Sequence, residues 1–196
     1  MGISIHYKGR LKTEDSLPKM IEEAKDIAEI HHWNYHIFER QFPENHFGKK
    51  TFNNEMYGIC FSPPECEPVQ LTFLSNGEMR SPSTLEPSDF SEEDQDLIKI
   101  LFTKTHYAGP AIHKIIIHFL DYISGKYFDE FELTDEAEYW ETKDEKLLYK
   151  NFHTLNKLID AFGQGLESNT MKQDETFEQY ILRIAQDIHK QQENDQ

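Results

Sequence analysis

The sequence predicts an α+β domain in which helices pack on one face of a mainly antiparallel, twisted sheet. Three patterns lead to this expectation. Short segments alternate apolar and polar residues, as half-buried strands do. The third and fourth expected strands are joined by a link too short for a parallel crossover, so at least that part of the sheet is antiparallel. Segments with helical spacing are separated by several strands. The expected order is β-α-β-β-β-(β)-β-α-β-α, with a C-terminal amphipathic helix after it.

The first three elements follow from alternation and from helix-start residues. Residues 3–8 alternate and predict a strand, as do residues 33–38. Between them, Ser16 resembles an N-cap and Pro18 lies in the first helical turn, so a helix is expected from there to His32.

The next strands are expected at residues 57–62 and 69–74. The link between them begins with two prolines and ends with a third, which makes it stiff. Asn76-Gly77 is typical of a hairpin turn, so residues 78–80 are expected to return as a short strand.

Residues 97–105 fit two structures. Ile98, Ile100 and Phe102 alternate as in a strand, whereas Leu97, Ile98 and Leu101 would also fit a helix. The strand is preferred, although period alone does not decide for so short an apolar run.

The remaining sequence is mainly helical. Gly109-Pro110 opens a helix that Gly125 follows, and residues 128–133 suit an edge strand. A second helix is expected to stop at Gly163 and Gly165. The expected apolar stripes are Ile112, Ile115, Ile116, Phe119 and Ile123 in the first helix, and Leu148, Phe152, Leu155, Ile159 and Phe162 in the second.

Two parts of the chain are expected: a single α+β domain at residues 1–167, then a polar link and C-terminal helix at 168–196. The last helix carries Phe177, Ile181, Ile184 and Ile188 on one side. This stripe either docks on its own domain or on a second copy, which would give a homodimer through the C-terminal helix.

The composition indicates the cellular compartment and the class of binding partner to expect. Only Cys60 and Cys66 occur, no apolar run is long enough for a bilayer, and no leader peptide is recognisable, so a cytoplasmic protein without membrane contact is expected. The net charge is −16, concentrated in residues 86–96 and 129–146. Such a surface disfavours nucleic acid and favours either simple solvation or a basic protein partner.

The strands have two different faces. One class of alternating positions is almost wholly apolar and is expected to face the helices. The other class is small and polar, and it forms either an ordinary solvated face or a binding platform. Its members are Ser4, His6, Lys8, Asn34, His36, Gly58, Cys60, Ser62, Gln70 and Thr72.

No metal or cofactor site is predicted. The two cysteines are six positions apart and no Cys-x-x-Cys pair occurs, so scattered histidines are favoured over a zinc site. Phosphate-loop, dinucleotide-binding and hydrolase motifs are also missing.

The turn before the Gly109 helix is a candidate site for a small anionic ligand. Lys104, His106 and His113 would surround backbone N–H groups at the positive end of that helix. The alternative is that Gly109-Pro110 simply starts a helix.

A third candidate segment contains Tyr139, Trp140 and Glu141 among acidic residues. The aromatic residues either anchor the loop or contact a ligand. With Glu67 and His113, Glu141 could supply acid–base groups. Two hypotheses therefore remain: a non-catalytic binding or regulatory protein that uses an acidic surface or the open sheet face, and a small enzyme or ligand-binding protein with a pocket near these residues.

Overall fold

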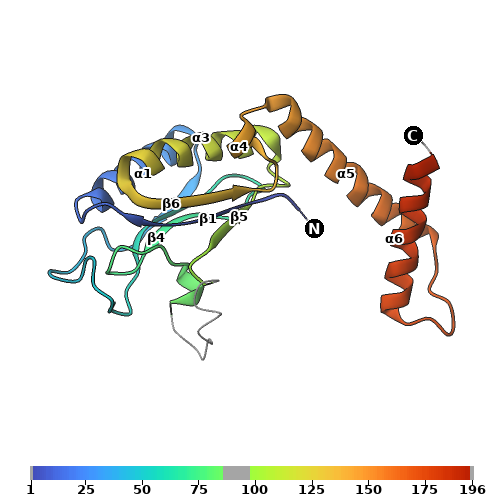
Figure 1. The fold of residues 1–196 in the computed structure, drawn as a ribbon, viewed down its shortest axis with the longest axis horizontal. Helices are drawn as coiled ribbons and strands as arrows, with labels where there is room; N and C mark the ends of the chain where they lie inside the picture. The colour runs from blue at the N-terminus through green and yellow to red at the C-terminus, as the bar shows by residue number, and fades with distance from the viewer. Residues whose placement is uncertain (1, 86–97, 195–196) are drawn as a thin grey trace. The chain divides into compact units, whose positions relative to one another are not determined.

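The computed structural model describes residues 2–85 and 98–194 (Figure 1). The described chain forms two compact units, Gly2–Leu148 and Tyr149–Gln196. None of its described helices combines the length and the apolar character that a membrane span requires. The acidic run at 86–96, and Leu97, lie outside the described residues.

The first unit confirms the predicted α+β class and the order of its elements. Its strands form two three-stranded antiparallel sheets, with orders β5-β1-β6 and β2-β3-β4. The strands are β1 (Ser4–Leu11), β2 (Asn34–Ile37), β3 (Tyr57–Ser62), β4 (Val69–Phe73), β5 (Leu101–Lys104) and β6 (Phe128–Asp135).

The predicted hairpin connects the two sheets. Gly77 adopts a φ of 87°, which a glycine tolerates, and Leu74 N–H donates to the Glu78 carbonyl at 2.9 Å. On the returning segment, Met79 N–H donates to the Gly9 carbonyl of β1 at 2.9 Å. The returning segment expected at residues 78–80 thus lies between β4 and β1, but it makes isolated bridges at Glu78 and Met79 and is not a full strand.

Helices cover one side of the strands, and long connecting segments lie on the other side (Figure 1). Strand alternation matches this arrangement, because the apolar class of β1, β3 and β4 is buried: Ile3, Ile5, Tyr7, Tyr57, Ile59, Phe61, Val69, Leu71 and Phe73. The helices and helical turns of this unit are α1 (Ser16–Ile30), η1 (Pro82–Thr84), α3 (Gly109–Tyr127) and α4 (Tyr139–Thr142).

Two helical expectations for the first unit need correction. Helix α1 begins at Ser16 itself, and the preceding Asp15 makes no side-chain cap bond. Helix α3 continues through Gly125, and its buried side includes His113, Ile117 and Leu120. The buried side of α3 is therefore rotated relative to the expected apolar stripe. It includes His113, which is hydrogen-bonded inside the unit.

The second unit contains most of α5 (Glu145–Ser168) and all of α6 (Phe177–Asn194). Helix α5 runs through Gly163 and Gly165, which were expected to stop it. A Cβ at Gly165 would lie 2.7 Å from the Ile184 side chain, so this glycine lets α6 approach closely. The buried side of α6 is Tyr180, Ile184 and Ile188, whereas Phe177 is 70% exposed.

Candidate functional site

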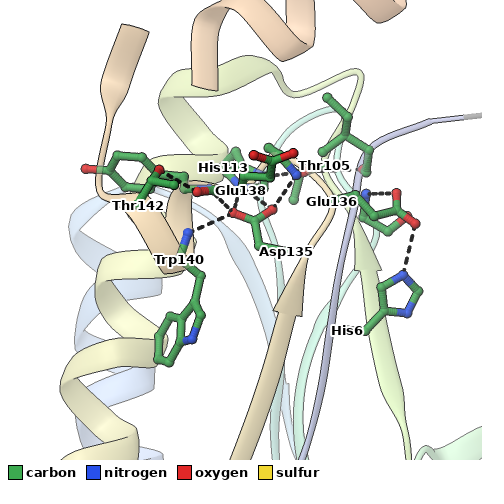
Figure 2. Close-up of polar contacts among 12 residues, drawn as sticks. His6, Thr105, His113, Asp135, Glu136, Glu138, Trp140 and Thr142 are labelled. Carbon is green, nitrogen blue, oxygen red and sulfur yellow. Dashed lines mark hydrogen bonds and ion pairs between the residues drawn. The ribbon is translucent and has the colours of Figure 1, made fainter. Parts of the chain in front are cut away.

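A buried polar cluster joins β5, α3 and β6 (Figure 2). The His113 Nδ1 atom lies 2.7 Å from Thr105 Oγ1, and its Nε2 atom lies 3.1 Å from the Asp135 carboxylate. The side chains of His113 and Asp135 have no exposed surface. The cluster therefore fixes three segments that are distant in the sequence.

Asp135 also organises the chain that follows β6. Its carboxylate accepts hydrogen bonds from the backbone N–H groups of Ala137, Tyr139 and Trp140, at 2.8 to 3.0 Å. Burial raises the pKa of Asp135, but the hydrogen bonds from His113 and the backbone outweigh it, so the pKa lies below its usual range.

One hydrogen-bond role follows from the ionised carboxylate. His113 Nε2–H donates to Asp135, whereas the donor in the Thr105–His113 hydrogen bond depends on whether His113 Nδ1 carries a proton, since the Thr105 hydroxyl also donates to the Ile3 carbonyl. This order of acid, imidazole and hydroxyl is that of a catalytic triad. Thr105 has no exposed surface, however, so the cluster has the environment of a structural brace.

His113 was expected at an accessible anion site in the turn before α3, but the structure buries its side chain. His106, its companion in that expectation, is also buried, with 4% of its surface exposed. Gly109 begins α3 with a φ of 82°, as a glycine can. The Lys104 Nζ atom lies 5.5 Å from the Tyr107 ring centroid.

Glu67 and Lys104 do lie together. The Glu67 carboxylate accepts a hydrogen bond from Lys104 N–H at 3.0 Å, and Glu67 N–H donates to the Lys104 carbonyl at 3.1 Å. These bonds attach the proline-framed link to the end of β5. Burial and then the charge of Glu67 raise the pKa of Cys66 to about 12, which disfavours its thiolate.

The aromatic pair on α4 acts as an anchor. Tyr139 is buried, and its hydroxyl lies 3.1 Å from His118 Nε2. Trp140 is half-buried, and the Lys143 Nζ atom lies 4.6 Å from its ring centroid. Glu141 is exposed on the same short helix.

A groove lies on the polar face of β1 and β6, with a cavity volume of about 320 Å³. Ion pairs join Lys8 to Glu132 at 2.9 Å and Arg10 to Glu78 at 2.5 Å. Three apolar residues also line the cavity: Met79, Ile100 and Phe131. The groove thus combines an apolar lining with charged walls.

Strand β6 borders this groove and is an edge strand, because among the described strands it pairs with β1 alone. Glu136 N–H donates to the Ser4 carbonyl, which sets the phase of the antiparallel ladder. By alternation, the backbone groups of Phe131 and Leu133 point away from β1. The sequence predicts an edge strand here and contains its acidic residues, but no pattern in the sequence indicates the groove.

The acidic residues of β6 other than the buried Asp135 are exposed. Glu132 pairs with Lys8, whereas Asp129 and Glu130 have no ion-pair or hydrogen-bond partner among residues 2–85 and 98–194. An extended, negatively charged strand edge is therefore presented to solvent.

Arg80 is a second unusual group. Only 7% of its surface is exposed, and its buried Nε atom has no hydrogen-bond partner. Burial lowers the pKa of Arg80, against the opposing effect of Glu78. A buried guanidinium nitrogen that has no partner among the described residues costs free energy unless an anion or water compensates it.

In the described part of the chain, no group of three or more His, Cys, Asp or Glu side chains is arranged to hold a metal ion. The chain matches no family model, no curated protein and no solved structure.

Proposed function

We propose that this chain is a non-catalytic binding protein that recruits an extended basic segment of a protein partner along β6. The observation that carries this proposal is the free, acid-bearing edge of β6 beside the groove. A sheet edge offers backbone donors and acceptors to an added strand, and the flanking side chains supply selectivity.

The chemistry of the edge favours a basic segment. The partner backbone would pair with the outward groups of Phe131 and Leu133, while its lysine or arginine side chains reach Asp129 and Glu130. Glu130 and Glu132 line the groove, so the basic side chains of the added strand would lie on the groove face, and its alternate apolar side chains would lie on the opposite face, near Phe131 and Trp140.

The buried cluster supports a binding role over a catalytic one. His113, Thr105 and Asp135 are the described residues whose arrangement most resembles catalytic machinery, and they are enclosed. Their bonds hold the C-terminal end of β6 in place, which supports a rigid edge.

The test uses an eight-residue fluorescent peptide of alternating lysine and valine, matched to the length of β6. Fluorescence anisotropy should show binding that weakens as salt rises, because exposed charges are screened. A charge-matched peptide with proline in place of valine cannot add as a strand and should bind at least about tenfold more weakly. Equal affinity of the two peptides would refute strand addition.

Two double variants test whether the acidic residues of β6 supply the charge that binds the peptide. The double variant Asp129→Lys/Glu130→Lys should weaken binding at least about tenfold. Its matched control, Glu14→Lys/Asp26→Lys, makes the same charge change at exposed positions near and on α1 and should bind as the unmodified protein does. If both double variants weaken binding equally, the β6 edge is not the binding surface.

The third variant, Leu133→Pro, removes an N–H group that the intrachain ladder does not use. It should lose the preference for the valine peptide while the melting temperature shows that the unit still folds. A retained preference would contradict pairing at β6.

A second candidate function is the binding of a small anion. The observation that favours it is the buried Nε atom of Arg80, which has no hydrogen-bond partner among the described residues. Inorganic phosphate should raise the melting temperature of the unmodified protein and not that of Arg80→Met. An equal response of the two proteins would exclude Arg80 as the anion site.

A further inference from the structure

The α5–α6 hairpin leaves an apolar face uncovered. Its core consists of Tyr180, Ile184 and Ile188, packed against half-buried neighbours that include Leu158 and Phe162. The unit Tyr149–Gln196 is much shorter than the ~70 residues below which one core rarely suffices without a disulfide, a metal or oligomerisation. Both cysteines of the chain lie outside this unit.

Helix α5 shows which side is uncovered. Helix α6 packs against Leu158, Ala161 and Phe162 and close to Gly165. At about 100° per residue, the apolar stripe of α5 that contains Leu155 and Ile159 lies about a quarter turn around the helix from this contact. The remaining flank is uncharged and consists of Leu155, Asn156, Ile159, Gly163 and Leu166.

Exposure agrees with this placement. Leu155 and Ile159 are half-buried, and Leu166 is 37% exposed. A Cβ at Gly163 would meet no atom within 4 Å, so no close contact among the described residues requires a glycine here. A glycine inside a helix costs about 1 kcal/mol relative to alanine, and an approaching helix would account for it.

Helix α6 continues the same face. Tyr180 contacts the end of α5 through bonds to the Leu166 and Asn169 carbonyls, so the helices run antiparallel. The flank of α6 about a quarter turn from its buried side includes Ile181 and Ala185, with Glu178 at its margin. Because the helices are antiparallel, the two flanks lie on the same side of the hairpin.

We propose that this face packs against a second copy of the chain, so that two hairpins form a four-helix bundle. Such bundles bury one apolar flank of each helix, and most homo-oligomers are symmetric dimers. Charge favours the second copy: the hairpin unit has 8 acidic and 5 basic residues, a net charge of −3, so the rest of the −16 chain carries −13. Two copies repel least when they meet through the hairpins.

The test is the molar mass of the full chain by light scattering after gel filtration, at about 1 to 100 μM because a dimer depends on concentration. The expected result is a dimer, with twice the 23.2 kDa of one chain. A monomer throughout this range would overturn the proposal and would indicate that the face docks within the chain or on another protein.

The variant Gly163→Glu/Ala185→Glu places charges on the proposed interface. Glutamate has a higher helix propensity than glycine, so the first change does not weaken the helix by itself. The variant should be monomeric with unchanged helical circular dichroism at high concentration. The control His153→Glu puts one negative charge on the exposed side of α5, and it should stay dimeric. A dimer of unchanged affinity in the first variant would refute this interface.

The dimer and the proposed peptide binding can fail separately. The Gly163→Glu/Ala185→Glu variant leaves β6 unchanged, so it should bind one peptide per chain with unchanged affinity. Asp129→Lys/Glu130→Lys should remain dimeric. Loss of the dimer in that variant would place the dimer contact on β6 and overturn the hairpin interface.

Discussion

Asp135 gives the sharpest test of what holds the candidate binding edge in place. In Asp135→Ala the backbone N–H groups of Ala137, Tyr139 and Trp140 lose their acceptor, and His113 loses its partner. An unsatisfied buried donor costs about 1–3 kcal/mol, and a hydrogen bond to a charged group contributes about 1.5–3 kcal/mol. These terms overlap because the chain relaxes, so we expect the free energy of unfolding to fall by about 4 kcal/mol.

Urea unfolding measures this loss. Trp140 lies beside the cluster, so tryptophan fluorescence reports its disruption, and circular dichroism reports the whole unit. Asp135→Asn keeps the shape and one oxygen acceptor and should lose less than the alanine variant. A loss below about 1 kcal/mol for Asp135→Ala would show that these hydrogen bonds contribute little net stability.

The pH dependence gives an independent check. The pKa of Asp135 is lowered in the folded chain, so its contribution is present above the unfolded pKa of about 3.9 and is lost as pH falls through the folded pKa. The difference in stability between the unmodified protein and Asp135→Asn should therefore be constant near neutral pH and shrink below about pH 4. A constant difference down to pH 2 would contradict a carboxylate role.

Three further predictions concern other positions. Gly58→Ala should destabilise the first unit by more than about 2 kcal/mol in thermal unfolding, because Gly58 has a φ of 115° and its Cβ would lie 2.0 Å from the Leu71 carbonyl oxygen; a change below 0.5 kcal/mol would contradict this. Cys66, with a pKa of about 12, should react with iodoacetamide at pH 7.5 far more slowly than glutathione does, and rapid labelling of the folded protein would contradict its environment. Arg183→Ala should return the pKa of Glu175 from about 2 toward its ordinary value in carboxyl NMR titrations, whereas an unchanged titration would show that the Arg183 hydrogen bonds are absent in solution.

Much of the first unit could be predicted because local patterns and tertiary packing agree there. The alternation of Tyr57, Ile59 and Phe61 places the same residues in the core that the structure buries. The strand preferred for residues 97–105 forms only at residues 101–104, and its buried face is the opposite of the one expected: Leu101 and Thr103 are buried, whereas Ile100 and Phe102 are exposed.

Other features depend on contacts that the sequence does not specify. Gly165 resembles a helix stop, but packing of Ile184 against it favours continuing α5. On α6, Tyr180 replaces Phe177 in the core because its hydroxyl bonds the carbonyls at the end of α5. Tertiary contacts overrode the local signals at both places.

The buried cluster was missed for a related reason. Asp135 lies directly before Glu136 and Ala137 at the end of a strand, and an Asp in this position is typical of a turn that accepts backbone N–H groups. The sequence therefore contained a signal for the turn at Asp135. It contained no signal for the pairing of Asp135 with His113, because that pairing depends on how α3 packs against β6.

The central place of β1 affects how the protein is made. Strand β1 leaves the ribosome well before the strands that pair with it on both sides, β5 and β6. The nascent chain must carry the alternating segment Ile3–Lys8 without its partners until residue 135 has emerged. Chaperone binding to early translation products, and aggregation of fragments that stop before β6, are the expected costs of this topology.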